Sequence, residues 1–328
     1  MATFLTTSKM DPALAARIEA SVRGRDRKAA GATLPPRLVA AVRFAVILGV
    51  VIAACSFVVA RRHDKREIDG TKAALLATVH GRAATVTAED RGAVGRMESW
   101  LVRFSGPYEG DFVADELRAP GAFAAVMARS AVYVRGPVGM FVDPPKIAET
   151  AATSAKDSLL LCLLEPPASR VEKDMLPKVR IAYGRGATME EHTPNVRRLH
   201  DAQVGLPFLL PRWSERVLTA EDPNELLRLR RDFEKAPIEA AKEAVRASIL
   251  VFAMDEPGDG AGPTELDGER AHAVRIGVVD LAAARPLLRL RKLVDPTWIS
   301  LAKKSEYATG LDGCGLAVDV HEHVAGKR

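Results

Sequence analysis

One stretch of the chain is apolar without interruption. Phe44 to Ala60 has seventeen residues with neither a charge nor a proline, and as an α-helix it would cover roughly 26 Å. The hydrocarbon core of a bilayer is about 30 Å thick. We therefore extend the helix to residues 37–62 and expect residues 38–60 to contact lipid, with Arg43 reaching the headgroups. The pattern predicts one N-terminal transmembrane helix.

The regions that flank this helix have different patterns. Residues 1–36 are rich in basic side chains, whereas residues 63–106 have helical periodicity. Within the latter, Thr87-Ala88-Glu89-Asp90 resembles a capping box with Asp at its last position. We predict a basic cytoplasmic tail over 1–36, a helical membrane-proximal stalk over 63–106 and a globular domain over 107–328.

The globular region contains short apolar runs that predict a sheet. Leu159–Leu164 and Ala247–Met254 have strand length and suit strands that are buried on both faces. Ala273–Val279 leads into Leu287–Val294, where leucines alternate with arginines, as in a hairpin with one wet face. Two weaker strands are expected at Ala131–Arg135 and Leu316–Val320.

Helices are expected between these strands. A capping residue followed by proline marks a helix start, and four such pairs occur: Asp143-Pro144, Thr193-Pro194, Asp222-Pro223 and Asp295-Pro296. Glu225–Lys235 and Ile238–Arg246 also have helical patterns. The fold class is therefore α+β, with a mixed, partly antiparallel sheet covered by helices.

Composition narrows the function classes. The chain of 328 residues is 48% hydrophobic and 27% charged, which excludes global disorder. Its net charge is +5, but residues 1–60 hold eight basic and three acidic residues, so the remainder has 39 of each sign. A neutral globular region with 5% aromatic residues has no bulk attraction for nucleic acid and few stacking platforms. We expect no nucleic-acid partner.

Known catalytic motifs are absent from the sequence. There is no G-x-x-x-x-G-K-[ST] loop, no strand followed by G-x-G-x-x-G, no G-x-S-x-G and no H-E-x-x-H. Gly184-Arg185-Gly186 is a lone glycine pair and is typical of a helix stop. We name no catalytic residue, expect no cofactor, and incline towards a protein that is not an enzyme.

Three groups of polar residues are candidate metal sites. Asp319, His321 and His323 would share one face of a strand, and imidazoles with a carboxylate suit zinc, but chain ends fray, so no metal is predicted there. Glu190-Glu191-His192 with His200-Asp201 favours a solvated cap region. Asp255–Glu269 carries six carboxylates; it fails the EF-hand pattern at Pro257 and Leu266, which favours an acidic hairpin loop over a calcium or protein-contact loop.

The cysteines allow one pairing in the globular region. We hypothesise a Cys162–Cys314 disulfide because an exported domain lies in an oxidising compartment. It would close a loop of about 150 residues and contribute about 5 kcal/mol in the chain-entropy model. Two buried thiols are the alternative, and Cα atoms more than about 7 Å apart would exclude the bond. Ile52–Cys55 resembles a lipobox, but the apolar run continues beyond Cys55, which favours an unmodified transmembrane cysteine.

Orientation and self-association follow from the membrane helix. Six basic residues lie within about 20 positions on its N-terminal side and five on its C-terminal side. That margin is small, and the lack of a cleavable signal favours an N-terminus in the cytoplasm with the domain outside. Small residues recur every four positions and permit a weak homodimer: Ala41, Ala45, Gly49 and Ala53.

These features together predict a function class. We expect a single-pass protein of the bacterial inner membrane that displays an extracytoplasmic α+β domain for binding or scaffolding an unknown protein or small molecule. The alternative is a membrane-anchored enzyme of unrecognised class, metal-assisted through the acidic loop or the terminal histidines.

Overall fold

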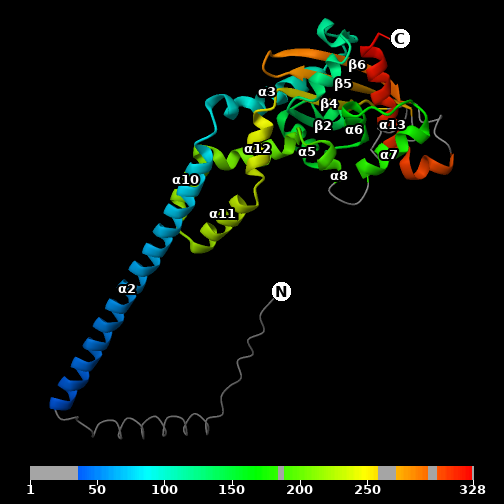
Figure 1. Ribbon diagram of the computed structural model, residues 1–328. Helices are drawn as coiled ribbons and strands as arrows, with labels where there is room; N and C mark the ends of the chain where they lie inside the picture. Colours follow the sequence, from blue (N-terminus) through cyan, green and yellow to red (C-terminus); the bar gives the residue numbers. More distant parts are fainter. Residues whose placement is uncertain (1–35, 184–187, 258–270, 295–300, 327–328) are drawn as a thin grey trace, which may run out of the picture. The chain divides into compact units, whose positions relative to one another are not determined.

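The fold was taken from a computed structural model, which describes residues 36–183, 188–257, 271–294 and 301–326 (Figure 1). The chain divides into two compact units, Met1–Asp69 and Gly70–Arg328. The expected basic tail, the glycine pair at 184–186, the Asp295-Pro296 helix start and most of the acidic loop lie outside the described residues.

The described part of the first unit is helical. Helix α2 runs from Pro36 to Ala83 and contains the whole apolar stretch. Within that stretch the large apolar side chains are exposed, with Phe44 69% and Phe57 64% accessible. Arg43–Ala83 is a candidate membrane span, with a most apolar window of mean hydropathy 2.4 that is 0% buried. By length and composition alone this is weak evidence of a span.

The second unit is built on a mixed six-stranded sheet in the order β1-β6-β5-β4-β2-β3. Strand β2 pairs in parallel with β3 and β4, whereas β4–β5, β5–β6 and β6–β1 are antiparallel. The α+β class with a mixed sheet is therefore confirmed. The strands are β1 (Phe112–Val113), β2 (Ala131–Pro137), β3 (Val196–Arg198), β4 (Ile249–Asp255), β5 (His272–Asp280) and β6 (Arg285–Val294).

Helices cover both faces of this sheet. The remaining helices are α3 (Ala88–Ser105), α4 (Ala122–Met127), α5 (Pro144–Thr153), α6 (Ser158–Leu164), α7 (Glu172–Tyr183), α8 (Thr188–His192), α9 (Leu199–Gly205), α10 (Pro211–Thr219), α11 (Pro223–Lys235), α12 (Ile238–Val245) and α13 (Leu301–Val324). One core joins alternate sheet residues such as Val251 and Ala253 to α4, α6, α7 and α13. On the opposite face, α3, α5 and α9 contact β4 and β2.

The opposite face shows how closely a helix can approach the sheet. The rings of Phe104 on α3 and Phe252 on β4 meet edge to face with centroids 4.8 Å apart. Phe252 in turn lies over Gly277 of β5, where an added Cβ would be 2.0 Å from the ring. Any side chain at Gly277 would therefore displace the aromatic pair that joins α3 to the sheet.

Several local predictions are confirmed. Thr87 and Asp90 form a reciprocal capping box at the start of α3, Asp143 and Asp222 cap α5 and α11, and β4 is buried along its whole length. In the β5–β6 hairpin, Leu288 and Leu290 are buried while the arginines between and beyond them are partly or fully exposed.

Two predicted strands are wrong. Leu159–Leu164 forms helix α6, and Leu316–Val320 lies within helix α13. Both runs are buried on every side, so their hydrophobic pattern has neither a period of 2 nor of 3.6. The decisive signal for α6 is its N-cap, because the Leu160 N–H donates to the Asp157 carboxylate at 3.0 Å and leucine favours helices over strands.

One predicted helix start also differs from expectation. Thr193-Pro194 does not start a helix but lies in the turn before β3, where the Thr193 hydroxyl donates to the Met189 carbonyl. Helix α3 lies in the segment predicted as a stalk over 63–106; it buries Met97 and Leu101 and contacts α9, α12 and β4. The domain bounds stay a prediction.

Candidate functional site

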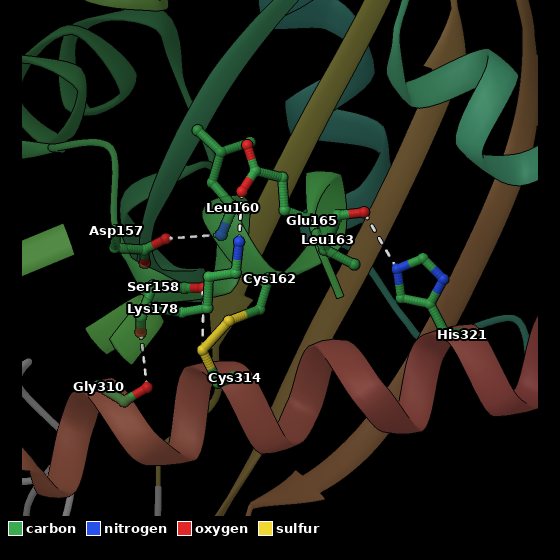
Figure 2. Close-up of a disulfide and its surroundings, with 10 residues drawn as sticks. All are labelled: Asp157, Ser158, Leu160, Cys162, Leu163, Glu165, Lys178, Gly310, Cys314 and His321. Atoms are coloured by element: carbon green, nitrogen blue, oxygen red, sulfur yellow. Dashed lines mark hydrogen bonds and ion pairs between the residues drawn. A yellow bond between two sulfur atoms is a disulfide. The ribbon is translucent and has the colours of Figure 1, made fainter. Parts of the chain in front are cut away.

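Helix α6 adjoins two polar or reactive features of the second unit, an ionic cluster and a disulfide. Its N-terminus adjoins a buried ionic cluster at the carboxyl ends of β2 and β4, and its middle carries a disulfide (Figure 2). The carboxyl ends of parallel strands are the usual place for ligand sites in α/β sheets. The surroundings of α6 are therefore the candidate functional site among the described residues.

The cluster is centred on Arg135, the fifth residue of β2. Its guanidinium donates from Nε and Nη2 to the two oxygens of Asp255, at 3.1 and 2.9 Å, and from Nη1 to Asp157 at 2.8 Å. The Tyr133 hydroxyl donates to the other Asp157 oxygen at 2.9 Å, and His272 Nε2 lies 3.5 Å from Asp255. All five residues are buried.

Protonation states in the cluster follow from burial and charge. Burial alone would raise the pKa of Asp255, but the Arg135 charge and the hydrogen bonds from His272 and Arg135 hold it well below its usual range. Burial would lower the pKa of Arg135, and the two aspartates raise it instead. Burial, followed by the nearby charge of Asp157, raises the pKa of Tyr133 well above its ordinary value. The cluster thus contains a cation, an ionised Asp255 and a neutral phenol.

This geometry is that of a structural cross-link. Bidentate arginine–carboxylate pairing is strong and directional, and here it ties the ends of β2 and β4 to the N-cap of α6. The three guanidinium nitrogens and both aspartates are engaged with one another. The arrangement holds three elements in register, because Arg135 of β2 bonds both to Asp255 of β4 and to Asp157 at the N-cap of α6.

The disulfide lies one turn further along α6. Cys162 and Cys314 are joined, with Cα atoms 5.2 Å apart, inside the range that a disulfide requires. Both residues are 0% exposed. On either side, the Ser158 hydroxyl donates to the Gly310 carbonyl at 2.7 Å, and His321 Nε2 lies 3.0 Å from the Leu163 carbonyl (Figure 2). Whether the bond forms in the cell remains a prediction.

The terminal zinc candidates do not come together. Asp319, His321 and His323 lie on helix α13, where residues two apart point about 200° from each other, so the shared strand face is wrong. Asp319 pairs with Arg170 at 2.8 Å, and His323 Nδ1 lies 3.0 Å from Lys292 Nζ. His321 packs edge to face on Phe123, and its burial lowers its pKa.

The other metal candidates are separated by ion pairs. Glu190 bonds to the buried Lys156 at 2.5 Å, while His192 Nδ1 lies 2.9 Å from Glu165. Of the acidic loop, the described Glu256 is held by Arg275 and Arg291. Among the described residues, no group of three or more histidine, cysteine or acidic side chains is arranged to hold a metal.

Sequence reasoning missed the ionic cluster. Asp157 could have been found, because Asp-Ser before a leucine run is an N-cap signal. Arg135 and His272 carried no such signal, since each is a lone polar residue at the end or start of a strand. Their contact with Asp255 arises from the pairing of β2 and β5 with β4, which no local pattern contains.

The geometry therefore describes a cross-linked domain and names no substrate. Comparison with known proteins found no matching family model, no matching curated protein and no matching solved structure.

Proposed function

We propose that this chain is a single-pass protein of the bacterial inner membrane that crosses the bilayer through residues 38–60 of α2. It displays its second unit outside the cytoplasm for binding or scaffolding of a protein or small molecule. The observation that carries the proposal is the apolar stretch of α2, whose side chains have no protein cover. In water, so continuous an exposed apolar surface would be unfavourable by about 25 cal/mol for each Å².

The placement of the domain outside the cytoplasm is supported by its cysteines. The pair Cys162 and Cys314 comes within bonding distance although 152 positions separate the two residues. Disulfides persist in oxidising compartments and are rare in the cytosol. An N-terminus inside and a second unit outside is the orientation that gives this pair a suitable environment.

A binding or scaffolding role is supported by the nature of the buried polar groups. In the Arg135 cluster, each guanidinium nitrogen donates to a buried aspartate, and this pairing favours a rigid platform over a reactive centre. The metal-assisted enzyme alternative gains no support from Asp319, His321 and His323, because these side chains have separate partners.

Membrane insertion is tested with the full chain expressed in a bacterium. The wild type should stay in the membrane pellet after alkaline carbonate extraction. Ile47→Lys combined with Val51→Lys should release it, since each lysine near the centre of a span costs roughly 3 kcal/mol. The matched control, Ile47→Leu with Val51→Leu, should remain in the pellet. A wild type found in the supernatant would overturn the anchor.

Orientation is tested with enzyme fusions after Arg328. Alkaline phosphatase becomes active only outside the cytoplasm, so this fusion should be active and a β-galactosidase fusion at the same junction inactive. The reverse pattern would place the second unit in the cytoplasm. The anchor itself would survive that result, which separates the two parts of the proposal.

A further inference from the structure

Helix α13 ends the described chain and packs against α6, α7 and β6 (Figure 1). Its contact with α6 and α7 is made through glycines. A Cβ at Gly313 would lie 2.6 Å from the Ser158 hydroxyl oxygen, and one at Gly310 would lie 2.5 Å from Val179. The α13 backbone therefore rests directly on its neighbours, and the fit tolerates no added side chain there.

The central part of α13 is a poor helix by itself. Gly310, Gly313 and Gly315 fall within six positions, and each glycine disfavours a helix by about 1 kcal/mol relative to alanine. Isolated helices of this kind are marginal in water. Asp312 and Asp319 are also taken into the buried side of the unit. The helix consequently depends on its contacts with α6.

Helix α6 shares one buried core with α13 and the sheet. Six of its seven residues are no more than 1% exposed, and its largest contacts are with α13 and α7. The sheet hydrogen bonds run from β1 to β3 without α13, and α3, α5 and α9 hold the opposite face. Loss of α13 would uncover α6, α7 and part of β6, while the hydrogen bonds of the strand ladder would stay in place.

We propose that α13 is a redox-controlled latch. With the Cys162–Cys314 bond intact, α13 stays on α6; with two thiols, α13 leaves α6 while the six-stranded sheet persists. The reductant is a dithiol: one thiolate attacks a disulfide sulfur to give a mixed disulfide, and its second thiol displaces that bond. Two electrons and two protons pass to Cys162 and Cys314, and the dithiol becomes a cyclic disulfide.

The burial of the sulfurs sets the order of these events. Cys162 and Cys314 are both 0% exposed, so a thiolate reaches them only when the α6–α13 contact opens transiently. The latch couples the Cys162–Cys314 bond to the position of α13. It does not depend on the proposed membrane anchor, so its test is independent of the enzyme fusions that report orientation.

The experiment measures amide hydrogen exchange by mass spectrometry on the full chain in detergent micelles, with and without dithiothreitol. In the reduced chain, amides of α13 from Gly310 onward should exchange at least about tenfold faster, while those of β4 and β5 stay unchanged. The matched control Cys55→Ala should respond as the wild type does, because Cys55 lies outside the disulfide.

A double variant removes the disulfide even if dithiothreitol cannot reduce the buried bond. Cys162→Ala with Cys314→Ala should show fast exchange in α13 whether or not the reductant is present. Slow α13 exchange in this variant would overturn the latch. So would an equal acceleration in β4 and β5, because it would mean that the whole unit loosens and that α13 has no separate response.

Discussion

Helices α2 and α6 are both apolar, yet their surroundings are opposite. From Phe44 to Val59 the large side chains of α2 are between 48% and 69% exposed, whereas Leu159–Leu163 of α6 are 0% or 1% exposed. The apolar stretch of α2 has basic residues on both sides, and α6 begins at an aspartate that is itself buried. An apolar run thus predicts removal from water, and its length and flanking charges decide whether lipid or protein provides the cover.

The largest expected difference in the stability of the second unit is between an aspartate placed in α6 and one placed in α2. Leu160→Asp would bury a carboxylate with no partner in α6 and should unfold the second unit, at a cost of more than about 5 kcal/mol. Leu48→Asp in α2 should leave that unit folded. Circular dichroism during urea titration checks both. If both variants unfolded the second unit to a similar extent, the apolar side chains of α2 and α6 would not differ in their surroundings as described.

The next effect concerns the cluster at the start of α6. Arg135→Leu would leave Asp157 and Asp255 buried without their cation and should destabilise the second unit by about 3–5 kcal/mol. Arg135→Lys keeps the charge but loses the bidentate geometry, so it should cost less. Urea midpoints measure both. Equal stability of Arg135→Leu and the wild type would show that the cluster does not hold α6.

Acid should weaken the same cluster. The folded-state pKa of Asp255 lies below its unfolded value, because the Arg135 charge outweighs the effect of burial. The stabilisation is therefore complete above the unfolded pKa of about 4 and is lost as the pH falls towards the folded value. Urea midpoints at pH 7, 4 and 3 should fall in that order. Asp255→Asn should flatten the curve, and an unchanged slope would assign the acid sensitivity elsewhere.

The smallest effect concerns pairing of α2 with a second copy. An added Cβ at Gly49 meets nothing within 4 Å in the single chain, so Gly49→Leu should leave α2 intact. If the small-residue face mediates a weak homodimer, this variant should reduce crosslinking in membranes several-fold. Leu48→Ile, a neighbouring change of equal volume, is the control. If Gly49→Leu crosslinks as strongly as the wild type, α2 does not form a homodimer through its small-residue face.

Local signals in the sequence determined much of this molecule. The helical apolar stretch, the caps at Thr87, Asp143 and Asp222, and the β5–β6 hairpin each depend on residues a few positions apart. Such features can be read from a short window because their hydrogen bonds and periodicity are contained within it. The mixed α+β class followed from them.

Tertiary structure decided what surrounds α6 and α13, although the N-cap at Asp157 is a local signal for α6. Leu159–Leu163 of α6 and residues 310–320 of α13 are buried on every side, so neither run shows the amphipathic period that separates a helix from a strand. The ionic cluster gathers Arg135, Asp157 and Asp255 from positions up to 120 residues apart. Contacts of that range arise from the packing of whole elements, so the residues next to them in the sequence do not predict them.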